Sequence, residues 1–311
     1  MKTTSLILQF LIFPGFLFTA AIGLIASWVD RKVTARIQYR IGPPWYQPFI
    51  DIVKLLGKET IVPAGSSQLL FLAAPLAGLA GVTLVSTLLW LSNLYPDSGF
   101  IGDIIVVLYL LTLPALSLIL GGFASGNPIA SLGASREMKM VLSYELPFVL
   151  AIAVPIIKSG GALTLGGILD YQAESGIIAG SISGALALIV AVLCMQAKLG
   201  LVPFDIAEAE TELMGGPIIE YSGAPLAVFK LTKAMLLFTM PMFLTVAFMG
   251  GFNPGGLSFL WGILKIAALL VIIVLIRNTN PRLRIDQALR FFWGHVTLLA
   301  ACGVVLALFG L

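Results

Sequence analysis

A carboxylate at position 145 stands in surroundings where carboxylates are rare. Glu145 lies inside the apolar stretch Leu142-Ser143-Tyr144-Glu145-Leu146-Pro147. An ionised carboxylate in such a stretch needs a partner or water, or it becomes neutral. A group held near that balance can take up and release protons. The alternative is a structural ion pair with Arg136 or Lys139, which lie nearby in the chain.

A second, denser group of acids follows Pro203. Its members are Asp205, Glu208, Glu210, Glu212 and Glu220. No basic residue lies between Lys198 and Lys230, so some of these acids should have raised pKa values. The spacing i, i+3, i+7 predicts that Asp205, Glu208 and Glu212 share one helical face. A solvated acidic loop is the alternative, but the apolar residues between the acids favour a partly buried, water-lined funnel that opens to the cytoplasm.

Other chemistry has little support in the sequence. The two cysteines, Cys194 and Cys302, lie far apart in apolar runs, and His295 is the one histidine. This composition argues against a zinc site or a cysteine-ligated iron–sulfur cluster, so we expect the chain to bind no metal and no redox cofactor. There is no catalytic triad, no glycine-rich phosphate loop and no nucleic-acid signature.

The elements that position these acids belong in a bilayer. Of the 311 residues, 59% are hydrophobic and 11% are charged, and the mean hydropathy is +1.04. Soluble domains are about 25% charged, so this chain cannot form the polar shell of a soluble enzyme. The composition also excludes a nucleic-acid binder and a disordered protein. We expect an all-α, multi-pass membrane protein.

Eight apolar segments are long enough to cross a bilayer. They are 5–28, 69–92, 101–124, 140–158, 177–197, 225–249, 258–277 and 291–311. We see no internal repeat and no composition shift, so residues 1–311 are expected to form a single polytopic membrane domain. The first segment has no small-residue cleavage site, and we interpret it as a retained helix.

Basic residues set the orientation. Fifteen of the 18 Lys and Arg residues fall in or beside the loops after the odd-numbered segments. Such loops face the cytoplasm, so both termini are expected on the outer side. The cytoplasmic loops are long, and Phe49, Ile52, Val53 and Leu56 recur at helical spacing in the first of them. This pattern predicts an amphipathic helix at the membrane surface or under a partner, with Asp51, Lys54 and Lys58 on its polar face.

The cytoplasmic loops resemble those of respiratory complex I subunit 1. The similarity rests on these runs: Arg31-Lys32, Ala35-Arg36-Ile37-Gln38-Tyr39-Arg40-Ile41-Gly42-Pro43, Gln47-Pro48, Ser135-Arg136-Glu137-Met138, Ser143-Tyr144-Glu145, Pro203-Phe204-Asp205, Glu208-Ala209-Glu210, Glu220-Tyr221-Ser222-Gly223 and Arg282-Leu283-Arg284-Ile285-Asp286-Gln287. It covers all four cytoplasmic loops and the count of eight spans.

One feature of the first loop favours a particular branch of this family. Three residues, Pro44, Trp45 and Tyr46, separate Gly42-Pro43 from Gln47-Pro48. The shortening resembles the membrane anchor of energy-converting group 4 [NiFe]-hydrogenases, which includes membrane-bound hydrogenase and formate hydrogenlyase, with a sulfur-reducing relative. In complex I this loop helps to shape the quinone entrance, so the shortening argues against a quinone chamber here.

The resemblance implies a role within a larger complex in the cell membrane of a prokaryote. The expected partners are hydrogenase-like large and small subunits on the cytoplasmic side, antiporter-like membrane subunits and, indirectly, ferredoxin. The [NiFe] centre and the iron–sulfur clusters would lie in those partners. Proton or ion coupling would fall to Glu145, Lys198, Asp205, Glu208, Glu210, Glu212 and Glu220. Docking of the partner would fall to Arg36, Arg40, Arg136, Arg282, Arg284 and Asp286.

One position departs from the family pattern. Related subunits often carry a glutamate five residues before the proline of Pro-Phe-Asp, where this chain has Lys198. Lys198 is therefore either a cation within the path or a counter-charge to the acids. The rival functions are a quinone-binding complex I subunit, the sulfur-reductase equivalent and a passive scaffold whose acids only bind the partner. A stand-alone transporter is disfavoured because such folds usually show inverted repeats.

Overall fold

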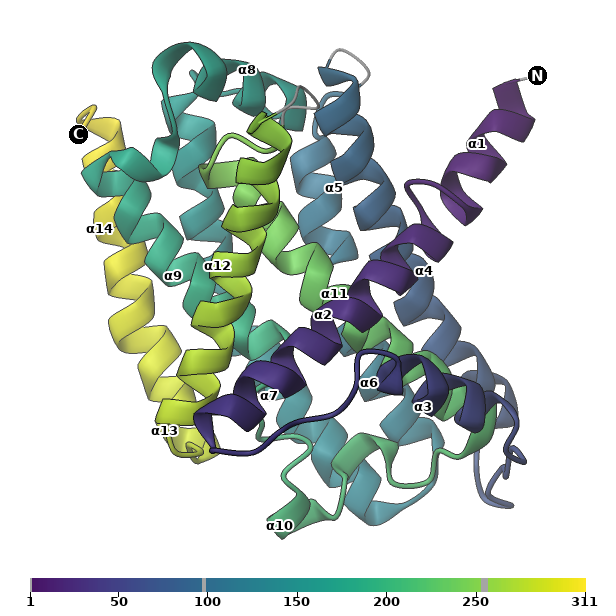
Figure 1. Ribbon diagram of the computed structural model, residues 1–311. Coiled ribbons are helices and arrows are strands. Elements are labelled where there is room, and N and C mark those ends of the chain that lie inside the picture. The colour runs from purple at the N-terminus through teal and green to yellow at the C-terminus, as the bar shows by residue number, and fades with distance from the viewer. Residues whose placement is uncertain (1, 97–98, 253–256) are drawn as a thin grey trace.

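The molecule is built from helices that run side by side (Figure 1). The computed structural model describes residues 2–96, 99–252 and 257–311, without the side chains of 2–6, 210–211 and 257–258. Within these residues there is no strand. Seven of the helical segments are long and apolar enough to cross a membrane, and a shorter apolar helix covers Ile182–Lys198. The predicted all-α membrane architecture is confirmed.

The helices follow one another in this order: α1 (Lys2–Leu11), α2 (Phe16–Ile37), α3 (Gln47–Leu56), α4 (Gln68–Leu94), α5 (Asp103–Leu110), α6 (Leu113–Ala124), α7 (Pro128–Lys158), α8 (Leu165–Ser175), α9 (Ile182–Lys198), α10 (Glu210–Leu213), α11 (Gly223–Phe248), α12 (Leu257–Thr279), α13 (Ile285–Arg290) and α14 (Thr297–Leu308). A π-helical turn, Phe291–Val296, joins α13 to α14. Two predicted spans are thus interrupted: the first is divided between α1 and α2, and the third between α5 and α6.

The fourth span is longer than the sequence predicted. We expected 140–158, but α7 begins at Pro128. The Asn127 side chain accepts a hydrogen bond from the Ile129 backbone N–H at 2.8 Å and so caps the helix start, a typical N-terminal arrangement. Polar residues such as Arg136 therefore belong to the same helix as the apolar segment. As a result Glu145 lies near the middle of α7, not at its end.

The acidic segment is not the helix that its spacing suggested. Asp205 and Glu208 lie in an irregular loop, and Glu212 lies in the short helix α10. The prediction that these three acids share one helical face was therefore wrong. Gly200 with φ +59° and Met214 with φ +55° break the helical path at the two ends of the segment. Each acid is consequently free to face a different neighbour.

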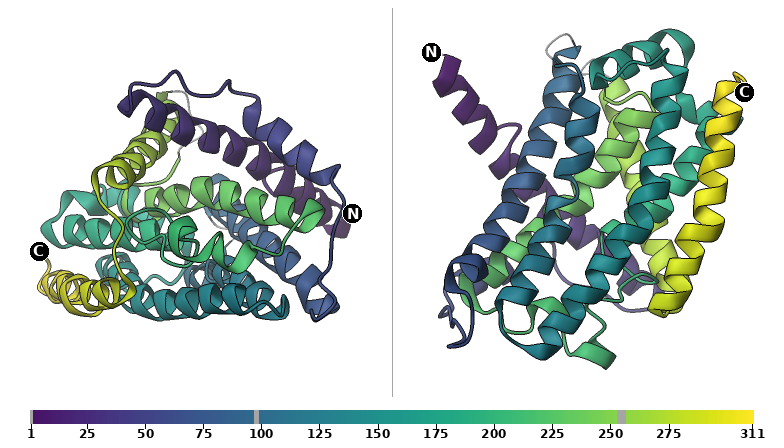
Figure 2. Two further views of the ribbon diagram at one scale, coloured as in Figure 1. Left: turned by 90° about the horizontal axis from the view of Figure 1, so that it is seen from below. Right: turned by 180° about the vertical axis from the view of Figure 1, so that it is seen from behind.

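Helix α11 occupies the centre of the bundle and is the most deeply buried span. It packs against α2, α4 and α12, and the view along the bundle in Figure 2 shows it surrounded by the other helices. Gly23 of α2 makes one close approach possible, because a Cβ there would lie 2.6 Å from the backbone oxygen of Ala234. Both chain ends lie at the same end of the bundle (Figures 1 and 2), as an even number of spans requires.

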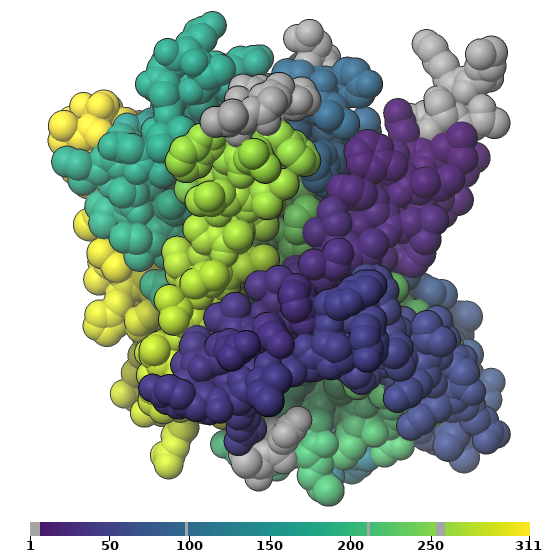
Figure 3. Space-filling view, viewed as in Figure 1, coloured from purple at the N-terminus to yellow at the C-terminus, as the bar shows by residue number. Residues whose placement is uncertain are grey.

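The amphipathic helix of the first long loop is present as α3. It lies on the surface at the end of the bundle away from the termini (Figure 3). Its orientation differs in part from the prediction. Asp51, expected on the outward polar face, pairs with Arg31 of α2, whereas Val53 and Leu56 are exposed. The exposed apolar pair suits a helix that meets lipid or a partner.

Candidate functional site

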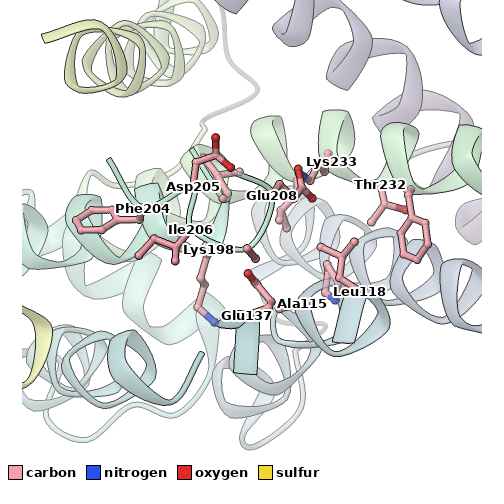
Figure 4. A pocket seen from close by; sticks show the side chains of 16 residues that line it. Ala115, Leu118, Glu137, Lys198, Phe204, Asp205, Ile206, Glu208, Thr232 and Lys233 are labelled. Atoms are coloured by element: carbon pink, nitrogen blue, oxygen red, sulfur yellow. The ribbon is translucent and has the colours of Figure 1, made fainter. Parts of the chain in front are cut away.

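Charged side chains gather around a small cavity at the α3 end of the bundle (Figure 4). The cavity has a volume of about 30 Å³, enough for a water molecule. We call it the relay cavity. Its ionisable lining residues are Glu137, Lys198, Asp205, Glu208 and Lys233. They come from α7, α9, the acidic loop and α11, so the site exists only when these elements pack together.

Glu208 and Lys233 form an ion pair at the wall of the cavity. Their charged groups lie side by side in Figure 4. Glu137 also faces the cavity and is buried, with 9% of its surface exposed. No hydrogen bond or ion pair of Glu137 is found among the described residues. A buried carboxylate without a direct partner needs water or a proton, and the cavity provides space for both.

Asp205 pairs with Arg282, which lies between α12 and α13. The Arg282 guanidinium donates to Asp205 Oδ2 at 2.7 Å. Burial raises the pKa of Asp205, and Glu208 raises it further, while Arg282 and Lys233 oppose this effect. The expectation that some of these acids have raised pKa values is confirmed for this residue.

Glu212 behaves in the opposite way. It is exposed on α10 and accepts a hydrogen bond from Arg136 at 2.5 Å, which lowers the pKa of its carboxyl. Arg136, Glu212, Arg282, Arg284 and Asp286 all line a surface groove of about 270 Å³. Four of the six residues predicted for docking therefore lie together, and they adjoin two of the predicted coupling acids, Asp205 and Glu212.

Glu145 lies deeper in the bundle and meets Lys198. The distance from Lys198 Nζ to Glu145 Oε2 is 2.8 Å, and the Lys198 side chain is 2% exposed. The contact is ionic only, because neither atom has a hydrogen-bond partner of suitable geometry among the described residues. Lys198 also lines the relay cavity. It is thus the residue that links Glu145 to the other acids.

The remaining predicted residues lie apart from the cavity. Glu220 accepts a hydrogen bond from Asn127 at 2.5 Å near the start of α7. Arg36 and Arg40 are exposed at the end of α2 and in the turn that follows. The side chain of Glu210 lies outside the described residues. The structure therefore brings Lys198, Asp205 and Glu208 to the cavity, with Glu145 one ion pair away, whereas Glu212 lines the neighbouring groove.

A second, larger cavity lies between α2, α3 and α11. Its volume is about 290 Å³, and it is lined by Leu24, Ser27, Asp30, Arg31, Pro48, Asp51, Ile52, Leu199, Leu201, Lys230, Lys233, Ala234 and Leu237. Arg31 donates to Asp51 at 2.9 Å. Burial acts to raise the pKa of Asp51, but the hydrogen bonds from Arg31 and Gln47 outweigh it, and the pKa is lowered. The expectation that the shortened first loop argues against a quinone chamber stays a prediction.

Two members of the site were missed in the sequence, although both carried a signal. Glu137 follows Ala130 and Ala134 and precedes Tyr144 at helical spacing, and all four lie on the buried face of α7. A carboxylate on such a stripe is unusual. Lys233 was assigned to a loop, yet it lies eight residues inside the predicted span 225–249. The count of basic residues in and beside the loops does not consider how deep in a span each residue lies, so it did not reveal the position of Lys233.

The arrangement can hold and move protons. Five ionisable groups border a water-sized space, and two of them have partners outside it: Asp205 pairs with the exposed Arg282, and Lys198 pairs with Glu145. Carboxylates joined by water can pass protons when their charges are balanced by nearby cations. Among the residues that the structure describes, no three His, Cys, Asp or Glu side chains gather as metal ligands would.

Comparisons with known proteins place these residues in a family. The NADH dehydrogenase family matches residues 8–308. An NADH-quinone oxidoreductase subunit from Thermomicrobium roseum is 34% identical, with 98% of this chain and 96% of that protein covered. NADH-quinone oxidoreductase subunit 8 of Thermus thermophilus is 33% identical, with 90% of this chain and 81% of that protein covered.

A solved structure gives the same result. A chain of the membrane-bound sulfane sulfur reductase, an archaeal respiratory membrane complex, is similar to this fold with a TM-score of 0.86 and 31% identity, covering 97% of this chain and 99% of that one. The similarity extends over all the spans described above. This multi-pass membrane protein therefore belongs to the NADH dehydrogenase family, that of respiratory complex I subunit 1.

Proposed function

We propose that the chain is the membrane anchor of a group 4-type respiratory complex. In this proposal it docks a cytoplasmic [NiFe]-hydrogenase-like module and couples ferredoxin-driven proton reduction to translocation of H⁺ or Na⁺ by antiporter-like subunits. The [NiFe] centre and iron–sulfur clusters belong to the docked module. This chain contributes the ionisable residues that pass charge from the module into the membrane.

The observation that carries the proposal is a series of charged groups along two adjoining spaces, the surface groove and the relay cavity. It begins at the surface with Arg136–Glu212, continues through Asp205 and Glu208 at the relay cavity, and ends with Lys198–Glu145 in mid-helix. Buried ionisable groups are costly in a membrane protein, and their default interpretation is functional. A passive scaffold would need only the surface members of this series.

The position of the series fits docking from the cytoplasmic side. The groove that holds Arg136, Arg284 and Asp286 opens beside Asp205 and Glu212. A partner that binds there changes the electrostatic surroundings of both acids directly. The effect can then reach the relay cavity, because Asp205 lines both spaces.

Each of two alternative functions is favoured by one specific observation. The 290 Å³ cavity beneath α3 combines apolar and charged walls, and the relatives named NADH-quinone oxidoreductase act on quinone. This combination favours a quinone-binding subunit. The likeness to the sulfane sulfur reductase favours an anchor for a sulfur-reducing module instead.

The test is an assay of the native complex purified through a tag on this chain. We expect nickel, hydrogen evolution from reduced ferredoxin and no reduction of added quinone. Quinone reduction without nickel would contradict the proposal and assign the larger cavity to quinone. Reduction of sulfane sulfur without hydrogen evolution would replace the hydrogenase module by the sulfur-reducing one, with the coupling role unchanged.

A further inference from the structure

We propose that Lys198 is the moving element of the relay. Its ammonium group would have two positions, one beside Glu145 and one beside the carboxylates of the relay cavity. The inference rests on the proposed coupling function. Coupling between separate sites requires an element with two states that both sites can bias, and the inference names that element.

The observed position is beside Glu145, and one ion pair holds it. The Nζ atom lies 2.8 Å from Glu145 Oε2 but makes no hydrogen bond of suitable geometry to a described residue. The rings of Tyr144 and Phe148 flank it, with ring centres at 5.3 and 4.9 Å. Such cation–π contacts favour a cation without fixing its direction. Attraction to the Glu145 carboxylate therefore keeps the Lys198 ammonium here, and loss of that negative charge can release it.

The second position is in the relay cavity. Lys198 already lines this space with Glu137 and Glu208. Glu208 has Lys233 as its cation, whereas Glu137 has neither an ion pair nor a hydrogen bond among the described residues. The cavity thus contains a buried carboxylate that has no ion pair of its own among the described residues and feels the charge of Lys233 only at longer range. In Figure 4 the Lys198 ammonium points away from Asp205 and Glu208 and toward the Glu137 side of the cavity.

The geometry of the helices lets one lysine serve both acids. Glu137 and Glu145 are eight residues apart on α7, which corresponds to about 12 Å along the helix axis. Lys198 is the last residue of the neighbouring helix α9, and α7 and α9 pack against each other. The flexible four-carbon stem of Lys198 can turn toward Glu145 or toward the relay cavity without movement of either helix backbone.

The direction of the switch follows from electrostatics. A buried ammonium needs a counter-charge, because an unpaired buried ion is strongly unfavourable. When Glu145 takes up a proton, Lys198 loses its counter-charge, and the ionised Glu137 becomes its partner. When Glu145 releases the proton, the ammonium returns. Protonation of Glu145 is therefore linked to the charge at the cavity.

A structure of the intact complex carrying Glu145→Gln tests the two positions directly. The substitution removes the charge of residue 145 and keeps its shape. We expect the Lys198 ammonium within hydrogen-bonding distance of Glu137 or Glu208. An ammonium that stays beside residue 145 would overturn the proposal.

A functional test separates a moving cation from a static counter-charge. Lys198→Arg keeps the charge, but its planar fork favours a fixed bidentate pair with Glu145. We expect the number of ions translocated per electron to fall at least tenfold, as for Lys198→Met. Lys158→Met, at the other end of α7, is the control and should leave this ratio unchanged. Full coupling in Lys198→Arg would show a static counter-charge and refute the switch.

Failure of the Lys198 switch can be distinguished from failure of the proposed coupling function. The double variant Asp205→Asn/Glu208→Gln tests the relay without touching Lys198. If the double variant uncouples the complex and Lys198→Met does not, the relay stands and the switch is wrong. If neither uncouples it, the coupling role itself is wrong. Should Lys198→Arg fail to assemble, the Glu145→Gln structure decides.

Discussion

At the scale of single residues, each acid is defined by the cation that faces it. Asp205 has Arg282, Glu208 has Lys233, Glu212 has Arg136 and Glu145 has Lys198. The acids are close in sequence or share a helix, but their cations come from other elements. This pairing lets several carboxylates stay near one another. Among the described residues Glu137 forms no ion pair, and it is the carboxylate without one that faces the relay cavity.

Glu137→Gln should uncouple the complex. The amide fills the same space but cannot carry a proton or attract a cation. We expect the number of ions translocated per electron to fall about tenfold or more, measured in vesicles that contain the whole complex. Glu174→Gln is the matched control, since Glu174 is exposed on α8. Equal coupling in the two variants would remove Glu137 from the relay.

Arg282→Met should destabilise the protein in a pH-dependent way. Burial raises the pKa of Asp205 in the folded protein, so the folded state binds more protons than the unfolded state above the ordinary pKa of 3.8. The contribution of this residue to stability therefore decreases as pH rises through that window. Loss of Arg282 raises the pKa of Asp205 further. The free energy of unfolding of the variant should therefore be lower at neutral pH than near pH 4.

The expected effect of Arg282→Met on stability is modest because the Arg282–Asp205 pair is partly exposed. A double-mutant cycle of Arg282→Met with Asp205→Asn should give a coupling free energy of about 1 kcal/mol at neutral pH. Thermal unfolding of the purified protein at the two pH values measures it. A coupling energy that does not change with pH would mean that Asp205 does not titrate in this way.

At the scale of elements, the site depends on where helices begin and end. The cap at Asn127 marks the early start of α7, so that Glu137 and Glu145 lie on the same helix. The irregular acidic loop then turns Asp205 and Glu208 toward different partners. Helix α3 covers the larger cavity beside them. Each element is simple, and the site arises where they meet.

Helix α3 should be shielded on its apolar face. Val53 is 66% exposed in the isolated chain, and Lys58 follows the helix on the polar side. Both cysteines are introduced in a Cys302→Ser background. In native membranes a water-soluble maleimide should label Lys58→Cys at least five times more than Val53→Cys. Val53→Cys should become reactive in unfolded protein. Equal labelling of both positions in the membrane would place α3 in water.

At the scale of the whole molecule, the sequence predicted the architecture well and the site in part. Eight apolar segments and the charge of the loops give the fold, because spanning helices are set by local composition. The pairings could not be predicted, since Arg282 lies 77 positions from Asp205 and meets it only through packing. The helical spacing of the acids was misleading for the same reason: Gly200 and Met214 interrupt the helix, and their effect depends on the surrounding fold.

The most direct test of the account is the coupling ratio of Asp205→Asn/Glu208→Gln in the intact complex. Ion uptake into vesicles and electron transfer would be measured in the same sample. The account predicts that ions translocated per electron fall at least tenfold while the complex still assembles. An unchanged ratio would contradict it and leave the acids as partner-binding groups of a passive scaffold.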